Sequence, residues 1–282
     1  MTVQALALSS VMVFAAVLQN GPAGGSRQDS TVVRLTYLAN EGVMAELPSG
    51  RVFFDALFGS GLDGYYVVPP NVRDSLESAA GRFGGRAVLL FTHSHPDHFN
   101  ANSTIRYLNA NAQSTAIMPS DARSAATAGG APRERTIVAG APVDGHRDHD
   151  LGWARVRALG MTHGGPRPEH AAYVVDVDGW SMLHIGDTGS EPQTWQAMGF
   201  PADGVDVALV PYWYMMDEAL ASQLVTHAKP KHIVVLHGPT PDAEDPGLRG
   251  LGGWAGFERR IMAAHRNAHV PGPDGETIVI RR

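Results

Sequence analysis

The sequence predicts an α/β domain built on mixed β-sheets, and three observations carry this prediction. Short β-rich runs at residues 31–39, 42–47 and 51–56 are separated by Asn-Glu-Gly and Pro-Ser-Gly turns, a pattern typical of an antiparallel meander. Residues 86–91 (RAVLLF) form a continuous apolar run, as expected for a strand that is covered on both faces. Beyond this run, strand-like and helix-like segments alternate without a linker, so we expect one α/β domain over residues 31–282.

The remaining elements follow from local periodicity and from helix-capping residues. Further strands are expected at residues 115–118, 136–139, 153–161, 171–177, 181–185, 205–211, 232–237 and 277–281. Helices are expected at residues 72–80, 97–110, 120–128, 217–228 and 254–266. Asp217 can cap its helix, and Pro230 stops it.

The composition excludes several classes of protein. The chain of 282 residues is 44% hydrophobic and 18% charged, which argues against a disordered or coiled-coil protein. Its formal net charge is −6 and it has no basic stripe, so nucleic acid is not an expected partner. The absence of cysteine excludes disulfides, thiolate zinc sites and a cysteine nucleophile. The 13 histidines therefore carry most of the information on function.

The first residues of the chain predict export. Residues 3–19 carry no charged side chain, and small residues follow at 21–25, as they do around a signal-peptidase site. The stretch is too short and too interrupted by Ser and Gln for a stable membrane span. We therefore interpret residues 1–24 as a signal peptide or a disordered tail. The signal peptide implies a periplasmic or secreted protein, and the tail implies a cytoplasmic one.

A dense group of histidines follows the apolar run. Residues 93–98 read His-Ser-His-Pro-Asp-His and lie at the C-terminal end of the expected strand, a frequent place for functional groups in α/β proteins. In extended backbone His93 and His95 point to the same side and can bind one metal ion. Asp97 and His98, expected in the first turn of the next helix, could serve a second ion. Burying these groups together without a cation would leave several of them unpaired, so the segment predicts a metal site.

This segment and several others resemble, in order, the metallo-β-lactamase-fold superfamily. His93-x-His95-x-Asp97-His98 matches the HxHxDH signature of that superfamily, and the hairpins over residues 34–56, which end in Phe54-Asp55, look like its N-terminal sheet. The later matches are Gly160-Met161-Thr162-His163-Gly164, Leu183-His184-Ile185-Gly186-Asp187-Thr188-Gly189 and Val234-Val235-Leu236-His237-Gly238. The resemblance covers about residues 32–282 and implies a four-layer αββα sandwich with two mixed β-sheets.

Carried over residue by residue, the resemblance implies a centre with two divalent metal ions. The implied ligands are His93, His95 and His163 for one ion, Asp97, His98 and His237 for the other, and Asp187 between the two. Nitrogen and carboxylate donors suit Zn²⁺, which we expect, and also iron or manganese. Because the chain lacks cysteine and has Asp97 in the pattern, it departs from the true zinc β-lactamases. It looks more like the lactonase, glyoxalase II and phosphodiesterase branches.

The implied activity is metal-assisted hydrolysis of a small ester, lactone, amide or phosphodiester. Two cations would share a bridging hydroxide, which Asp97 would orient while it also binds metal. The alternatives are a mononuclear iron oxygenase of the persulfide dioxygenase type, a nuclease of the same fold, and a noncatalytic metal-binding protein. A single-metal enzyme would not need all seven ligands. The sequence predicts neither the bond that is cleaved nor the oligomeric state.

Aromatic residues are candidates for the wall of a substrate pocket. Tyr212 and Trp213 follow an expected strand, in a segment read as a loop, and Tyr66 lies with Tyr65 in a loop expected at the same sheet edge. Ordinary packing beneath these loops is the alternative. If the loops face the metals, the pocket is apolar and aromatic, which favours a neutral acyl or lactone-like substrate.

Four further histidines have less specific surroundings in the sequence. His146 and His149 are expected in a solvated turn rather than in a second metal site. His170 is expected either at the rim of the site or at the surface. His184 alternates with apolar residues and is expected to pack or to support a metal ligand.

Overall fold

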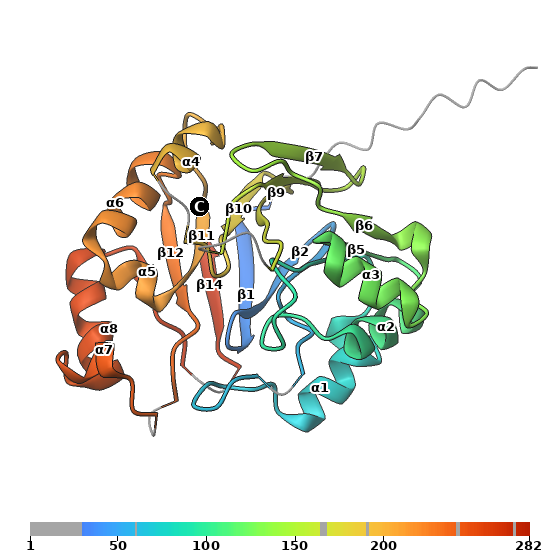
Figure 1. Cartoon of the computed structure of the whole chain (residues 1–282), viewed down its shortest axis with the longest axis horizontal. Helices are drawn as coiled ribbons and strands as arrows, with labels where there is room; N and C mark the ends of the chain where they lie inside the picture. Colours follow the sequence, from blue (N-terminus) through green and yellow to red (C-terminus); the bar gives the residue numbers. More distant parts are fainter. Residues whose placement is uncertain (1–29, 60, 164–167, 190–191, 241–242, 273–274) are drawn as a thin grey trace, which may run out of the picture.

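The protein has two β-sheets packed face to face, with helices on both outer faces (Figure 1). The computed structural model describes residues 30–59, 61–163, 168–189, 192–240, 243–272 and 275–282. Helices α1 to α3 lie on the right of Figure 1 and helices α4 to α8 on the left. This four-layer αββα arrangement confirms the expected fold class. The segment 1–24, interpreted as a signal peptide or tail, lies outside the described residues.

The first sheet begins as the expected antiparallel meander and continues with parallel strands. Its strands, in spatial order, are β14 (Thr277–Arg281), β1 (Val32–Ala39), β2 (Gly42–Leu47), β3 (Gly50–Phe54), β4 (Ala87–Leu90), β5 (Ser114–Met118) and β6 (Thr136–Val138). The strands β14 to β3 pair antiparallel, and β3 to β6 pair parallel. The outer face is covered by α1 (Pro70–Glu77), α2 (Ala101–Ala110) and α3 (Ser120–Ala128). Two short 3₁₀ turns, Gly81–Phe83 and Arg133–Arg135, join these elements.

The second sheet mirrors the first, with an antiparallel half and a parallel half. Its strands, in spatial order, are β13 (Ala268–His269), β12 (His232–Leu236), β11 (Val207–Pro211), β10 (Trp180–His184), β9 (Ala172–Val177), β8 (Arg155–Leu159) and β7 (His146–Asp150). The covering helices are α4 (Pro192–Ala197), α5 (Tyr212–Met216), α6 (Glu218–His227), α7 (Pro246–Arg249) and α8 (Gly253–Ala264). The strands β7 to β10 pair antiparallel, and β10 to β13 pair parallel.

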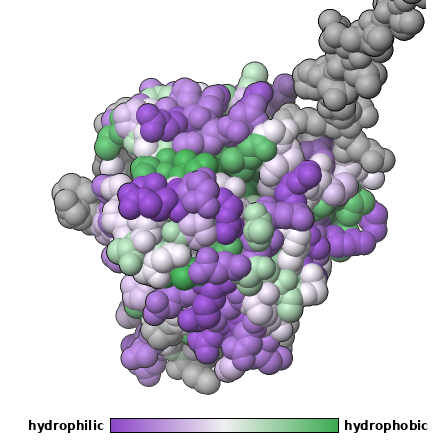
Figure 2. All heavy atoms as spheres, turned by 90° about the vertical axis from the view of Figure 1, so that its right-hand side faces the viewer, coloured by the Kyte–Doolittle hydropathy of each residue, from purple (hydrophilic) through white to green (hydrophobic). Residues whose placement is uncertain are grey.

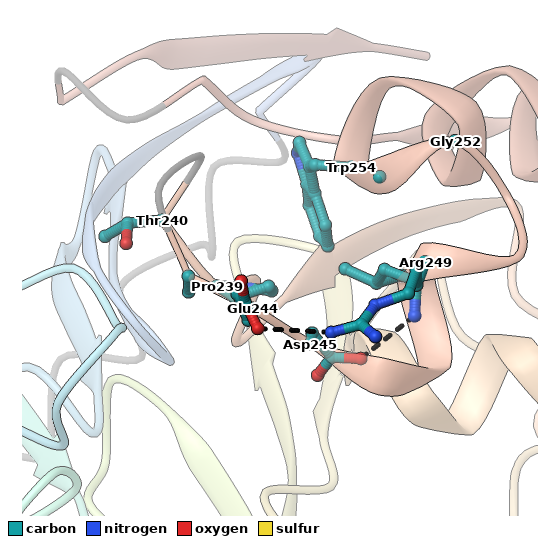
Figure 3. A pocket seen from close by; sticks show the side chains of 10 residues that line it. Pro239, Thr240, Glu244, Asp245, Arg249, Gly252 and Trp254 are labelled. Atoms are coloured by element: carbon teal, nitrogen blue, oxygen red, sulfur yellow. Dashed lines mark hydrogen bonds and ion pairs between the residues drawn. The ribbon is translucent and has the colours of Figure 1, made fainter.

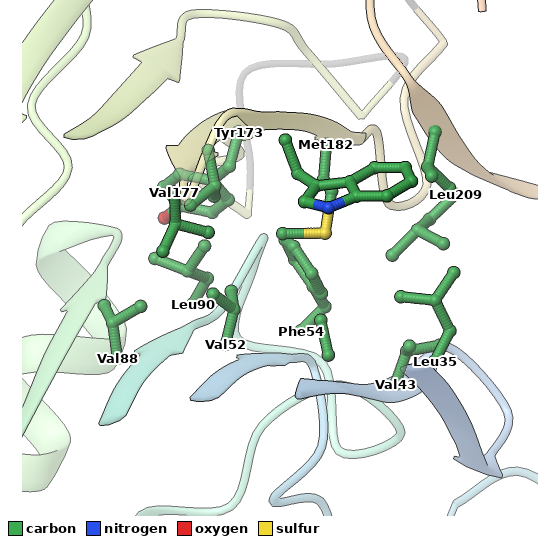
Figure 4. Close-up of a cluster of buried hydrophobic side chains, with 14 of the residues drawn as sticks. Leu35, Val43, Val52, Phe54, Val88, Leu90, Tyr173, Val177, Met182 and Leu209 are labelled. Carbon is green, nitrogen blue, oxygen red and sulfur yellow. The ribbon is translucent and has the colours of Figure 1, made fainter. Parts of the chain in front are cut away.

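The core between the sheets explains why the central strands are apolar on both faces. Figure 4 shows Leu35, Val43 and Phe54 of the first sheet opposite Met182 and Leu209 of the second. Each fully buried side chain of this kind contributes roughly 1.5–3 kcal/mol. The other face of each sheet packs against helices, whose outer surfaces stay polar. The face formed by α1 to α3 is accordingly mostly hydrophilic in Figure 2.

Three expectations for local structure were wrong. The helix expected at residues 97–110 begins only at Ala101, because the Asn100 side chain accepts from Ser103 N and caps it there. His146 and His149 lie in strand β7 rather than in a turn, since that segment pairs with β8. Residues 212–216 form helix α5 rather than a loop.

The structure gives one finding on membranes. Among the described residues, no helix is both long enough and apolar enough to cross a bilayer.

Candidate metal centre

The seven implied ligands gather where strands of both sheets end. His93, His95, Asp97 and His98 follow β4 of the first sheet, while His163, Asp187 and His237 follow β8, β10 and β12 of the second. Side chains from strand ends meet here because parallel strands deliver their C-terminal ends to the same edge of a sheet. The site therefore lies between the two halves of the sandwich.

The seven residues form two clusters joined by one carboxylate. We call His93, His95 and His163 the outer cluster, and Asp97, His98 and His237 the inner cluster. Within each cluster the potential ligand atoms lie within 4.8 Å of one another. Asp187 reaches both clusters, since Oδ2 lies 3.4 Å from His163 Nε2 and Oδ1 lies 3.4 Å from His98 Nε2. The structure thus brings together all seven residues selected from the sequence.

The free atoms of the site fit a metal centre. His98 Nε2, His163 Nε2, His237 Nε2 and Asp187 Oδ1 are buried and have no hydrogen-bond partner within the described part of the chain. Buried polar atoms are rarely left unpaired, because each one loses its hydrogen bonds to water. Imidazole nitrogen and carboxylate oxygen at this spacing are the ligands that zinc, iron and manganese take. The donor set therefore fits divalent metal ions.

The charges of the site favour cation binding. Burial opposes ionisation of Asp187, but the neighbouring His98 and His163 outweigh it and hold the pKa of Asp187 well below its ordinary value. The pKa of Asp97 is lowered in the same way, against burial, by His237 and His98. Burial lowers the pKa values of His93 and His95, which keeps these rings neutral and able to bind metal.

Asp55, to which the sequence analysis assigned no role, orients two of the histidines. It follows β3 and accepts at Oδ2 from His98 Nδ1 at 2.9 Å, while Oδ1 and Oδ2 accept from the amide and the hydroxyl of Thr92 at 2.8 and 2.6 Å. The Thr92 hydroxyl in turn lies 3.0 Å from His93 Nδ1. Because both Nδ1 atoms are engaged, both Nε2 atoms face the other donors. The sequence feature that could have indicated this role is the position of Asp55, a carboxylate directly after a buried strand.

A close approach of the two sheets also shapes the site. Gly186, just before Asp187, has a φ of +53°, and a Cβ there would lie 2.6 Å from the Thr92 hydroxyl oxygen. Only glycine fits this position without strain. The turn that delivers Asp187 therefore packs directly against the residue that supports His93.

The three aromatic residues predicted to line a substrate pocket, Tyr66, Tyr212 and Trp213, have different surroundings in the structure. The centres of the Trp213 and His237 rings lie 4.7 Å apart, and the centre of the Tyr65 ring lies 4.9 Å from that of His237. Tyr66 packs against the apolar cluster beneath the first sheet. Tyr212 is buried in the second-sheet cluster and donates its hydroxyl hydrogen to Asp245. Trp213 and Tyr65 thus form an aromatic wall beside the inner cluster.

A cavity of about 530 Å³ opens beyond His237 (Figure 3). Pro239, Asp245, Arg249 and Trp254 are among its lining residues, and Arg249 pairs with Glu244 at its mouth. The indole of Trp254 presses on Gly238, where a Cβ would lie 2.4 Å from the ring. The residue after His237 must therefore be small.

Two other histidines lie close to the centre. His170 is partly buried, its ring lies 5.5 Å from that of His93, and Nδ1 donates to Met161 O at 3.1 Å. Burial lowers the pKa of His170 to about 4. His184 is fully buried at the end of β10, with Nε2 3.0 Å from Asp55 Oδ2, in a supporting position such as the sequence suggested.

The comparisons with known proteins agree with this geometry. Residues 50–240 match the family model described as the beta-lactamase superfamily domain. A search of curated proteins found no match.

Several solved structures share the fold at low sequence identity. Igni18, a novel metallo hydrolase from the archaeon Ignicoccus hospitalis, is 19% identical with a TM-score of 0.59, covering 89% of this chain and 100% of its own. A possible metal-dependent hydrolase from Veillonella parvula is 15% identical with a TM-score of 0.62, covering 88% and 99%. CmlA, a diiron β-hydroxylase from Streptomyces venezuelae, is 15% identical with a TM-score of 0.58, covering 90% and 54%. Such likeness shows a common fold.

Proposed function

The chain belongs to the beta-lactamase superfamily, and we propose that it is a dinuclear metal-dependent hydrolase of small substrates. The observation that carries the proposal is the convergence of seven nitrogen and carboxylate donors, four of which offer buried atoms without a partner in the described structure. His93, His95 and His163 would hold one ion, and Asp97, His98 and His237 the other, with Asp187 between them. Zn²⁺ is the expected metal, and the donor types also suit iron or manganese.

Individual residues of the site would have different roles in the proposed hydrolysis. Two divalent ions held by these ligands would supply a nucleophilic hydroxide near neutral pH and would offset negative charge on the reacting oxygens. Asp97 would orient that nucleophile while it also binds metal. Its Oδ2 lies among the inner-cluster ligands, 3.2 Å from His237 Nε2 and 3.5 Å from His98 Nε2. Asn40 Nδ2 donates to the same oxygen at 3.3 Å and so limits rotation of the carboxylate. We assign Asp97 as the catalytic residue on this basis.

The surroundings of His237 support an acyl or lactone-like substrate. Trp213 and Tyr65 give this side of the site an aromatic wall, and no lysine or arginine lies among the contacts described for the seven ligands. A neutral, partly apolar group suits such a wall better than a polyanion does. Export to the periplasm or the medium, expected from residues 1–24, is part of the proposal and is tested by the mass of the protein isolated from its host.

The test combines metal analysis with a panel of lactones, β-lactams, thioesters and phosphodiesters. We expect about two transition-metal ions per chain and turnover of at least one panel class that disappears after chelation and returns with Zn²⁺. His227→Asn, which changes a partly exposed histidine at the end of α6, is the matched control and should keep both properties. One tightly bound iron with oxygen consumption and no hydrolysis would instead favour the oxygenase alternative.

A further inference from the structure

The metal centre is divided between two sheets, which raises the question of what fixes the distance between its halves. The first sheet supplies residues 93–98, and the second supplies His163, Asp187 and His237. Between the sheets lies an apolar core, whose contacts are not directional. A metal site must hold its ligands within about 0.5 Å of their positions, which calls for directional contacts between the two halves.

The first such contact joins His184 to Asp55. His184 ends β10 of the second sheet, three residues before Asp187, and Asp55 follows β3 of the first sheet. Both side chains are fully buried, and His184 Nε2 donates to Asp55 Oδ2 at 3.0 Å. Asp55 also orients His98 directly and His93 through Thr92. This hydrogen bond therefore ties the strand that delivers Asp187 to the residue that aims the histidines of the opposite sheet.

The second contact runs through the turn between β1 and β2. Asn40 Nδ2 donates to Asp97 O at 3.2 Å and to Asp97 Oδ2 at 3.3 Å, while Asn40 O accepts from His237 N at 3.0 Å. One residue thus holds an inner-cluster ligand from each sheet. Asn40 and His237 both have positive φ, 50° and 58°, a conformation that only a few non-glycine residues adopt readily. The bond from His237 N to Asn40 O joins these two backbone positions directly.

The carboxyl group of Glu41, the residue after Asn40, lies close to the first of these contacts. It is fully buried, neither carboxyl oxygen has a hydrogen-bond partner in the described structure, and Oε2 lies 3.5 Å from His184 Nε2. Potential ligand atoms of Glu41, Asp55 and His98 lie within 4.8 Å of one another. Glu41 therefore packs against both the His184–Asp55 hydrogen bond and the ligand His98.

We propose that Asn40, Glu41 and His184 are positioning residues that hold the two halves of the metal centre at a fixed spacing. The inference rests on the proposed function, because it concerns the same metal ions. It differs from a general stabilising role in one respect: the loss of these contacts should change how the metals are held, beyond any change in folding.

The experiment measures Co²⁺ binding to the full chain by competition with a chromophoric chelator. It also records the visible spectrum of bound Co²⁺ and the thermal unfolding of the metal-free protein.

The variants each change one of these contacts. His184→Leu removes the donor to Asp55, and His184→Gln keeps an amide donor. Asn40→Gly keeps the positive φ and removes the side-chain bonds to Asp97. Glu41→Gln keeps the shape and replaces one carboxyl oxygen with an amide nitrogen. Tyr107→Phe is the control, since it removes another buried hydrogen bond, to Phe83 O at 2.7 Å, beneath the first sheet.

We expect His184→Leu and Asn40→Gly to weaken Co²⁺ binding roughly ten- to a hundredfold and to alter the spectrum, as changes behind metal ligands usually do. His184→Gln should recover much of both losses, and Glu41→Gln should weaken binding by about tenfold. Tyr107→Phe should lower the unfolding temperature and leave affinity and spectrum unchanged.

The possible failures are distinguishable. A wild-type chain that binds no Co²⁺ contradicts the proposed function itself. If the wild type binds about two ions but the variants match its affinity and spectrum, or if Tyr107→Phe changes them equally, the positioning role is wrong and the proposed function stands. If His184→Leu does not fold, His184→Gln and Asn40→Gly decide the outcome by the same two readouts.

Discussion

The inner and outer clusters of the metal centre use the same kinds of ligand, but the protein holds them differently. Asp97, His98 and His237 are all buried, and Asn40 or Asp55 bonds to each of them. In the outer cluster only His93 is buried, whereas His95 and His163 are partly exposed, and the His163 side chain is 25% accessible. The side chains of the inner cluster are therefore held by the protein itself, whereas those of the outer cluster are held less firmly. We therefore expect tighter binding at the inner cluster.

The largest effect should come from Asp187, the residue that the clusters share. Asp187→Asn keeps the size of the side chain but removes the charge that offsets repulsion between two cations. We expect loss or loosening of at least one metal and a fall in turnover of roughly two orders of magnitude or more. Circular dichroism should show that the fold survives, because the core lies elsewhere. Unchanged metal content and rate would remove Asp187 from the site, and the dinuclear account with it.

A paired substitution separates the clusters. His98→Asn removes an inner ligand that Asp55 holds, and His95→Asn removes a partly exposed outer ligand. We expect His95→Asn to retain about one metal ion and His98→Asn to retain less than that, because the preorganised half has been lost. Elemental analysis after gel filtration checks this. Equal losses in the two variants would contradict the asymmetry.

The pH dependence of metal binding has a defined sign in both clusters. The Asp187 carboxylate, whose Oδ2 lies 3.4 Å from His163 Nε2, raises the pKa of His163. The carboxylates of Asp187, Asp55 and Asp97 raise the pKa of His98 well above its ordinary value despite burial. Each ring must release the proton at Nε2 before it can bind metal. Affinity should therefore fall as the pH drops from about 8 to about 6, with about two protons released per chain loaded near neutral pH. Calorimetry in buffers of different ionisation enthalpy counts these protons, and a count of zero would contradict the assignment.

The smallest effect on metal binding should come from the aromatic wall that only the inner cluster has. Trp213→Leu and Tyr65→Leu remove rings that contact His237 edge-on but leave every donor atom in place. We expect the metal content to stay unchanged and KM for the best panel substrate to rise by about tenfold, since the wall binds substrate rather than metal. A loss of metal in either variant would show that the wall acts on His237 itself.

The seven residues that gather at the site were selected through the resemblance to a known family, and several of them follow recognisable strand ends. His93, Asp187 and His237 each come after a short apolar run, so the topology alone brings them to one edge. The supporting residues were harder to predict because their contacts are non-local. His184 reaches Asp55 across 129 positions of sequence, and no local pattern encodes that pairing. Asn40-Glu41-Gly42 was read only as a turn, although its side chains also face the site.

Local errors had local physical causes. The helix expected from Asp97 begins only after Asn100, since the amide oxygen of Asn100 caps it and the preceding residues turn around His95 O. Tyr212 follows a strand as expected, yet its ring turns into the core and its hydroxyl donates to Asp245. The spacing of apolar residues along a helix or strand shows which face each residue occupies. It does not show where a side chain points once the helix or strand has ended.

The most direct test of the account is a stepwise titration of the metal-free protein with Co²⁺, followed by the visible spectrum and checked by elemental analysis. Two metal ions in clusters of unequal preorganisation should give two binding phases, complete at about two ions per chain. A chelator should then remove the more weakly held, outer ion first. A single phase that ends at one ion per chain, with the spectrum unchanged by further Co²⁺, would contradict the dinuclear centre.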